Sequence, residues 1–64
     1  MKPHEERLVA EEKALGEKIE RLNTFIHSEE FAELPLNERL LLKRQKDTMS
    51  AYRSILVERI SLIQ

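Results

Sequence analysis

Cysteine is absent from this 64-residue sequence, and glycine, proline and aromatic residues are scarce. Disulfides are therefore excluded, and the two histidines, His4 and His27, are too far apart in sequence to suggest a structural zinc site. One glycine and two prolines provide few turns, which argues against a sheet or a loop-rich enzyme. Since about 60 residues bury little apolar surface, we expect the chain to be stabilised by self-association, at least as a dimer.

Long hydrophobic runs are also missing. The longest are the triplets 40–42 and 55–57, and the amino-terminal residues are mostly polar or charged. We therefore expect no signal peptide and no membrane span, and we expect a cytoplasmic protein. The sequence also has no glycine-rich phosphate loop and no recognisable nucleophile with a neighbouring base. We expect no catalysis, no cofactor and no metal, so the protein should bind without turnover.

Seven-residue repeats fill the second half of the chain. Two of the three rows are apolar and the third is polar, which gives a helix an apolar arc too broad for one partner helix. A helix of this kind should contact a second surface, such as another copy of the chain. The two apolar rows are Leu41/Ile55/Leu62 and Leu42/Met49/Leu56/Ile63, and the polar row beside them is Gln45/Tyr52/Arg59.

These features predict an all-α protein, a two-helix antiparallel hairpin with a short helical turn in its connection, self-associating into a helical bundle. Pro3 suits the first turn of a helix, Ser28 can cap the short turn, and Pro35 ends it because the residue before proline avoids the α region. The whole chain, residues 1–64, forms one hairpin, with helix 1 over about 3–27, the connection over 28–35 and helix 2 over about 36–63.

Helix 1 has an apolar stripe that two residues disturb. Glu12 occupies a position where the spacing requires an apolar residue. Gly16 costs about 1 kcal/mol relative to alanine in a helix interior, so it is either a tolerated loss or a point of close backbone approach beside Ala10 and Ala14. The stripe itself consists of Leu8, Leu15, Ile19, Leu22 and Ile26.

Charge is unevenly distributed although the net charge is only −1. Residues 1–34 hold nine acids and five bases, a balance of −4, whereas residues 35–64 hold six bases and three acids, a balance of +3. One interpretation is that the two helices attract each other. The other is that helix 2 offers positive charge to an anion, from the basic stretch Arg39, Lys43, Arg44 and Lys46.

A family resemblance follows from the spaced apolar and polar positions of residues 15–60. The chain resembles a small helical family of tailed bacteriophages associated with crAss-like phages. More distantly it is similar to the phage helical-hairpin sponges that sequester the cyclic nucleotide signals of CBASS and Thoeris immunity. The aromatic-rich motif of those sponges is absent, so the ligand stays open. The matching positions are Phe25-Ile26, Phe31, Leu34, Leu41-Leu42, Gln45, Met49, Tyr52, Ile55-Leu56 and Arg59-Ile60.

The resemblance implies a phage counter-defence protein of the host bacterial cytoplasm that binds a cyclic oligonucleotide or an ADP-ribose-type signal. Such a ligand presents flat bases and several phosphates, and its binder needs stacking groups and cationic donors. Tyr52, Arg59 and Gln45 lie along one side of helix 2 and could face their symmetry mates in an oligomer. Further phosphate contacts could come from the neighbouring residues Arg53, Lys46 and Arg44.

Each candidate residue also has a structural explanation. Tyr52 could be an interface aromatic, Arg59 could pair with a glutamate such as Glu12, and Gln45 could fix the register of a seam. Two other functions stay open: a helical adaptor that binds a protein through its apolar face, and a dimeric hairpin that binds RNA, although nucleic acid is the less favoured partner. In the RNA-binding hypothesis the phosphate contacts come from Arg39, Lys43, Lys46 and Arg53.

Overall fold

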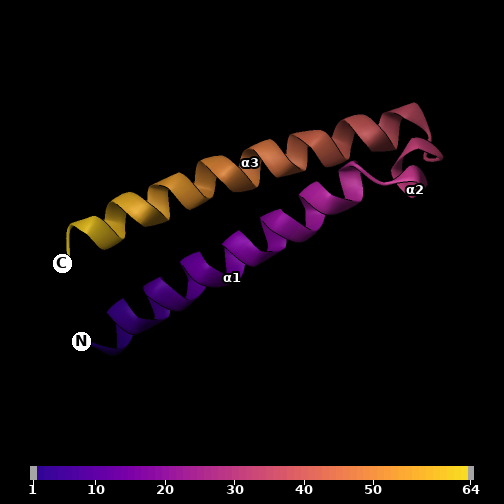
Figure 1. The fold of residues 1–64 in the computed structure, drawn as a ribbon. Helices are drawn as coiled ribbons and strands as arrows, with labels where there is room; N and C mark the ends of the chain where they lie inside the picture. The colour runs from indigo at the N-terminus through magenta and orange to yellow at the C-terminus, as the bar shows by residue number, and fades with distance from the viewer. Residues whose placement is uncertain (1, 64) are drawn as a thin grey trace.

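The computed structural model describes residues 2–63 and consists of two long helices joined by a short one (Figure 1). Helix α1 spans Pro3–Ile26, α2 spans Glu29–Ala32 and α3 spans Leu36–Ser61. The long helices lie side by side and antiparallel, so both termini are at one end and α2 is at the other. This arrangement confirms the all-α hairpin with a helical turn in the connection; self-association remains a prediction.

Local sequence signals explain the ends of the helices. Pro3 is the first residue of α1, and the Glu5 carboxylate accepts a hydrogen bond of 2.9 Å from the backbone N–H of Lys2. Ser28 caps α2, because its Oγ accepts from the N–H of Phe31 at 3.2 Å while donating to the carbonyl of Phe25 at 2.6 Å. The chain then reaches α3 through Leu34 and an extended Pro35.

The closed end of the hairpin is built on Phe31, which is buried. Its ring meets the Phe25 ring edge-on, with centroids 6.2 Å apart, and the Lys43 ammonium lies 5.9 Å from its centroid. The Arg39 Nε donates a hydrogen bond of 3.0 Å to the carbonyl of Leu34. The connection is thereby fixed to both long helices by an aromatic pair and two basic side chains of α3.

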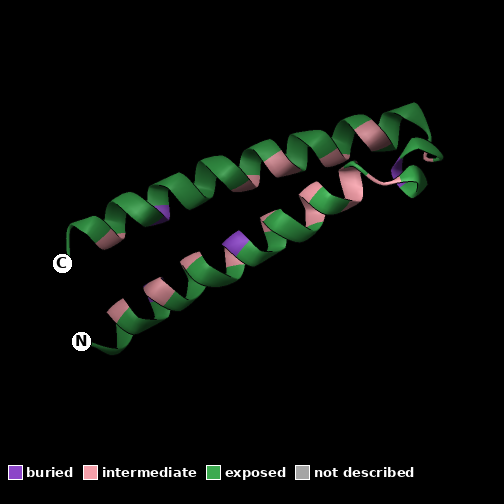
Figure 2. Ribbon diagram, viewed as in Figure 1, coloured by how far each residue is buried: buried purple, intermediate pink, exposed green. Residues whose placement is uncertain are grey.

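The core is small. Among the described residues only Leu8, Phe31 and Leu56 are buried hydrophobic side chains, and Leu56 alone is fully buried. Figure 2 shows that the buried and half-buried segments of α3 face α1, whereas most of its ribbon is exposed. Within the described range, the helices that reach membrane-spanning length lack the apolar composition to cross a bilayer. A single hairpin thus buries little apolar surface for its length.

Candidate functional site

The inner face of α3 follows a heptad pattern in which residues alternate at spacings of four and three. The apolar members of this face are Leu42, Met49, Leu56 and Ile60, all half-buried or buried. The positions between them hold Lys46 and Arg53, two basic residues that the sequence interpretation assigned to ligand binding. We refer to the contact between this face and α1 as the seam.

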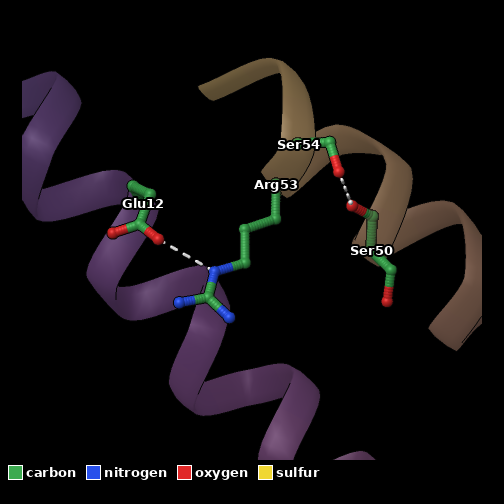
Figure 3. A network of polar contacts seen from close by, with 4 residues as sticks. All are labelled: Glu12, Ser50, Arg53 and Ser54. Atoms are coloured by element: carbon green, nitrogen blue, oxygen red, sulfur yellow. Dashed lines mark hydrogen bonds and ion pairs between the residues drawn. The ribbon is translucent and has the colours of Figure 1, made fainter. Parts of the chain in front are cut away.

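Both basic residues of the seam have partners on α1. The Lys46 Nζ donates a hydrogen bond of 2.6 Å to the Oδ1 of Asn23. The Arg53 Nε lies 2.9 Å from the Oε1 of Glu12, and the Arg53 and Glu12 side chains are 45% and 19% exposed (Figure 3). Glu12 therefore interrupts the apolar stripe of α1 because it faces an arginine, and its arginine partner is Arg53 rather than Arg59.

Gly16 has a specific steric role in the seam. It is buried, and a Cβ at this position would lie 2.8 Å from the Arg53 Cζ and 2.9 Å from its Nη2. The missing side chain leaves room for the guanidinium to lie against α1. The glycine therefore accommodates a side chain of the facing helix, and its neighbours Ala10 and Ala14, which are exposed, take no part in a close backbone approach.

A different side of α3 carries the polar line, which we define as Gln45, Tyr52 and Arg59. All three residues are exposed. The Tyr52 hydroxyl donates a hydrogen bond to the Glu11 carboxylate of α1. This hydrogen bond raises the pKa of Tyr52 from its ordinary value of 10.0, slight desolvation of the hydroxyl and the Glu11 charge raise the pKa further, and the Arg59 charge lowers it. Tyr52 and Arg59 are thus electrostatic neighbours, as their seven-residue spacing predicts.

An apolar row borders the polar line on the solvent side. We define the flank row as Leu41, Thr48, Ile55 and Leu62, which repeat every seven residues. The leucine and isoleucine side chains are between 53% and 85% exposed, and Tyr52 beside them is 42% exposed. An apolar stripe of this length on one side of a helix is typical of a contact surface.

Arg44 lies on the same side of α3, one turn from Leu41. It is exposed and has no hydrogen bond or ion pair with any residue from 2 to 63. Together with Asn37, Leu40 and Leu41 it lines an open depression of about 410 Å³. Three further depressions on the described surface have volumes of about 270 to 440 Å³, and one of these three is lined by both long helices, where Glu12 meets Val57, Ile60 and Ser61.

The six candidate ligand residues therefore divide into two groups. Tyr52, Arg59, Gln45 and Arg44 are exposed on the flank of α3, where the sequence interpretation placed the first three. Lys46 and Arg53 bond to α1 instead of pointing together toward an external ligand. Gln45 also contacts the Met49 sulfur, at 3.9 Å. Each of the four basic residues proposed for RNA binding makes a contact within the hairpin. These residues are Arg39, Lys43, Lys46 and Arg53.

Sequence reasoning missed Glu11, the pairing of Asn23 with Lys46 and the role of Gly16. The signal was available in part, because residues 46, 53 and 60 share a heptad position and continue the inner face of Leu42, Met49 and Leu56. Lysine and arginine are usually expected at exposed positions, so Lys46 and Arg53 were not recognised as members of this inner face. The Nδ1 of His27, one of the two histidines that are too far apart in sequence to suggest a zinc site, lies 2.8 Å from the carbonyl oxygen of Asn23.

Comparison with known proteins identifies the family. A family model described as Sequestin matches residues 2–62, which is nearly the whole chain, and the chain therefore belongs to the Sequestin family. No curated protein and no solved structure matches the chain. The family name indicates a sequestering, binding function, which confirms the likeness to sponge-type proteins at this coarse level.

Proposed function

We propose that this Sequestin-family protein captures a small anionic nucleotide signal and holds it without cleaving it. The observation that carries the proposal is the polar line on α3, where an aromatic, a guanidinium and an amide are exposed beside an apolar row. The family name supports a sequestering role for this surface. Tyrosine and leucine can cover the face of a base, and arginine can bind phosphate through two parallel hydrogen bonds.

The charge distribution of α3 supports an anionic ligand. Lys46 and Arg53 already have partners on α1, so Arg59 and Arg44 are the flank arginines that remain for phosphate. Guanidinium groups remain charged throughout the physiological range and match the geometry of phosphate oxygens. We infer a cyclic oligonucleotide or an ADP-ribose-type molecule, captured in the cytoplasm of a bacterium whose phage defence uses such a signal.

A single hairpin can cover only one side of such a ligand. Binding clefts usually enclose most of the ligand surface, whereas the flank of α3 is open to solvent. We therefore include in the proposal that two or more copies of the chain associate and enclose the ligand between them. The small core of the hairpin favours the same conclusion, since domains of this size usually need additional support.

The test is a thermal-shift panel of cyclic dinucleotides, cyclic trinucleotides and cyclic ADP-ribose isomers, each with its linear counterpart. At a ligand concentration 100-fold above Kd the stabilisation is about 2.7 kcal/mol, which raises the melting temperature by roughly 10–20 °C. Arg59→Ala and Tyr52→Ala should remove this shift. Arg21→Ala, an exposed arginine of α1, is the matched control and should retain it. If no member of the panel moves the melting curve, the proposal is wrong.

The exposed flank row also supports a second candidate, a helical adaptor for a protein partner. In that case no nucleotide shifts the melting curve, and Ile55→Lys abolishes capture of the partner. For the RNA-binding hypothesis, each of the four basic residues it requires already has a contact within the hairpin, which makes these residues less available to phosphate. An RNA complex would instead weaken steeply with salt, which a titration in sodium chloride measures.

A further inference from the structure

The flank row of α3 repeats every seven residues, so it is symmetric about its own midpoint, and the residues at its two ends are both leucine. Leu41 and Leu62 are at its ends, and their midpoint falls between Ala51 and Tyr52. An antiparallel copy of α3 rotated about that midpoint would bring each Leu41 to the partner's Leu62 and each Thr48 to the partner's Ile55. Leu40 would meet the partner's Ile63. Every exposed apolar side chain of the row would then contact another apolar or small side chain.

The opposite pairing, α3 against the partner's α1, is less favourable. The side of α1 that is next to Tyr52 carries Glu11 and Lys18, with the half-buried Leu15 between them. Placing the flank row there would bury charged groups under leucine and isoleucine, which is costly.

The contact area suits a small dimer interface. The hairpin measures 45 × 14 × 13 Å, and one of its long sides includes the flank row together with the half-buried Leu15 and Leu22 of α1. The outline of such a side is smaller than the roughly 800 Å² per partner of a standard interface, so the dimer would belong to the small end of stable contacts. Six of the eight exposed large hydrophobic residues of the described chain would be covered: Leu40, Leu41, Tyr52, Ile55, Leu62 and Ile63.

One pair of residues does not fit this otherwise complementary contact. The same rotation brings Arg44 opposite the partner's Arg59, and both are exposed and of like charge. The depression of about 410 Å³ beside Arg44 is lined by Leu40 and Leu41, which would meet the partner's Ile63 and Leu62. An anion between the two guanidinium groups would remove their repulsion, and the leucines would provide an apolar floor for a base.

We propose that two chains pair through antiparallel α3 helices about Ala51 and Tyr52, and that each of two equivalent clefts holds one nucleotide phosphate between Arg44 of one chain and the partner's Arg59. The ligand class rests on the proposed function, whereas the pairing does not. The two clefts are 15 residues apart, about 22 Å along the helix, so a small cyclic nucleotide occupies one cleft. The dimer therefore binds two ligand molecules, and binding strengthens the dimer.

Cross-linking tests the pairing without any ligand. The chain has no cysteine, so Ala51→Cys introduces a single thiol next to its own symmetry mate. Mild oxidation should convert most of this variant to a disulfide-linked dimer. Ser54→Cys, exposed on the same helix but facing away from the flank row, is the matched control and should stay largely uncross-linked. Equal cross-linking of the two variants would overturn the pairing.

Sedimentation equilibrium of charge variants tests the same surface. Ile55→Lys should weaken the dimer at least a hundredfold, because it places two buried lysines in the interface. Val57→Lys, at a position 49% exposed but on another side of α3, should leave the dimer intact, which makes it the control for Ile55, 53% exposed. A well-folded monomer in the unsubstituted protein at micromolar concentration would contradict the proposal.

Mixing two inactive variants tests the shared cleft. Arg44→Ala and Arg59→Ala should each abolish the thermal shift given by the best nucleotide of the panel. When the two variants are mixed and allowed to exchange subunits, about one quarter of the clefts regain both arginines, and binding should return to that extent. Calorimetry of the unsubstituted protein should give one ligand per chain.

The outcomes separate the two proposals. If both variants lose binding but mixing restores none, the arginines act within one chain and the shared cleft is wrong, although the proposed function stands. If Arg44→Ala binds normally, the shared cleft is likewise wrong. If no nucleotide binds while Ala51→Cys cross-links, the proposed function and the cleft are both contradicted, and only the pairing of the helices is retained.

Discussion

The seam and the flank of α3 both repeat every seven residues, but the side chains of the seam have partners on α1, whereas those of the flank are exposed to solvent. The seam places apolar side chains against α1 and gives Lys46 and Arg53 their own partners, Asn23 and Glu12. The flank exposes leucine and isoleucine next to Arg44 and Arg59, for which residues 2–63 provide no such partners. A surface whose polar groups are already paired is built for folding. A surface that leaves both apolar and cationic groups unpaired is suited to binding.

Leu56 and Val57 provide the largest contrast between the two surfaces, because they are adjacent in sequence but 0% and 49% exposed. Leu56→Ala should cost about 2–5 kcal/mol, which is enough to unfold most of a domain this small. Val57→Ala should stay within about 0.5 kcal/mol. Urea unfolding followed by circular dichroism measures both. Similar losses for the two variants would mean that the hairpin core does not centre on Leu56.

Gly16 sharpens the comparison at the seam. Gly16→Ala gains helix propensity of about 1 kcal/mol, but its Cβ displaces the guanidinium of Arg53, whose end is flexible. We expect a small net gain in the free energy of unfolding. In an Arg53→Ala background the same substitution should give the full gain, because nothing has to move. Equal gains in the two backgrounds would show that the arginine does not lie on Gly16.

The ion pair between Arg53 and Glu12 should contribute less to the free energy of unfolding than the burial of Leu56. Because the arginine side chain is 45% exposed, water and salt screen the interaction, and a double-mutant cycle with alanine should give about 0.3–1 kcal/mol. The coupling should fall further in 1 M salt. A coupling that is unaffected by salt would indicate that the pair is held by packing rather than by charge.

The smallest effect on stability is expected from the hydrogen bond of Tyr52, whose titration can be followed separately from that of every other group. Its hydrogen bond to Glu11 raises its pKa, so the contribution to stability is present below about pH 10 and is lost as the pH rises through the folded-state pKa. The chain has one tyrosine and no tryptophan, so phenolate absorbance reports this group alone. Glu11→Gln should lower the pKa, whereas Glu12→Gln should not. If the Tyr52 titration in Glu11→Gln is unchanged, Tyr52 does not hydrogen-bond to Glu11, and this contact between the helices is wrong.

Much of the fold could be predicted because its signals are local. Ser28 and Pro35 mark the connection, and the apolar stripe of α1 predicts a buried helix face. Less of the candidate site could be predicted from the sequence. The candidates Tyr52 and Arg59 follow from their shared side of α3, but the partner Glu11 comes from residues 41 positions away. Helical spacing relates residues within one helix and gives no information about the facing helix.

The sequence by itself determined where the helices begin and end and that α3 carries two apolar rows, since caps, prolines and heptad spacing act over a few residues. Only the tertiary structure decided which row faces α1. Packing Leu56 inside and leaving Ile55 outside fixes the rotation of α3, and that single rotation pairs Arg53 with Glu12 and leaves Arg59 and Arg44 exposed. The reason is that both rows satisfy the same periodicity, so the choice depends on the fit between two surfaces.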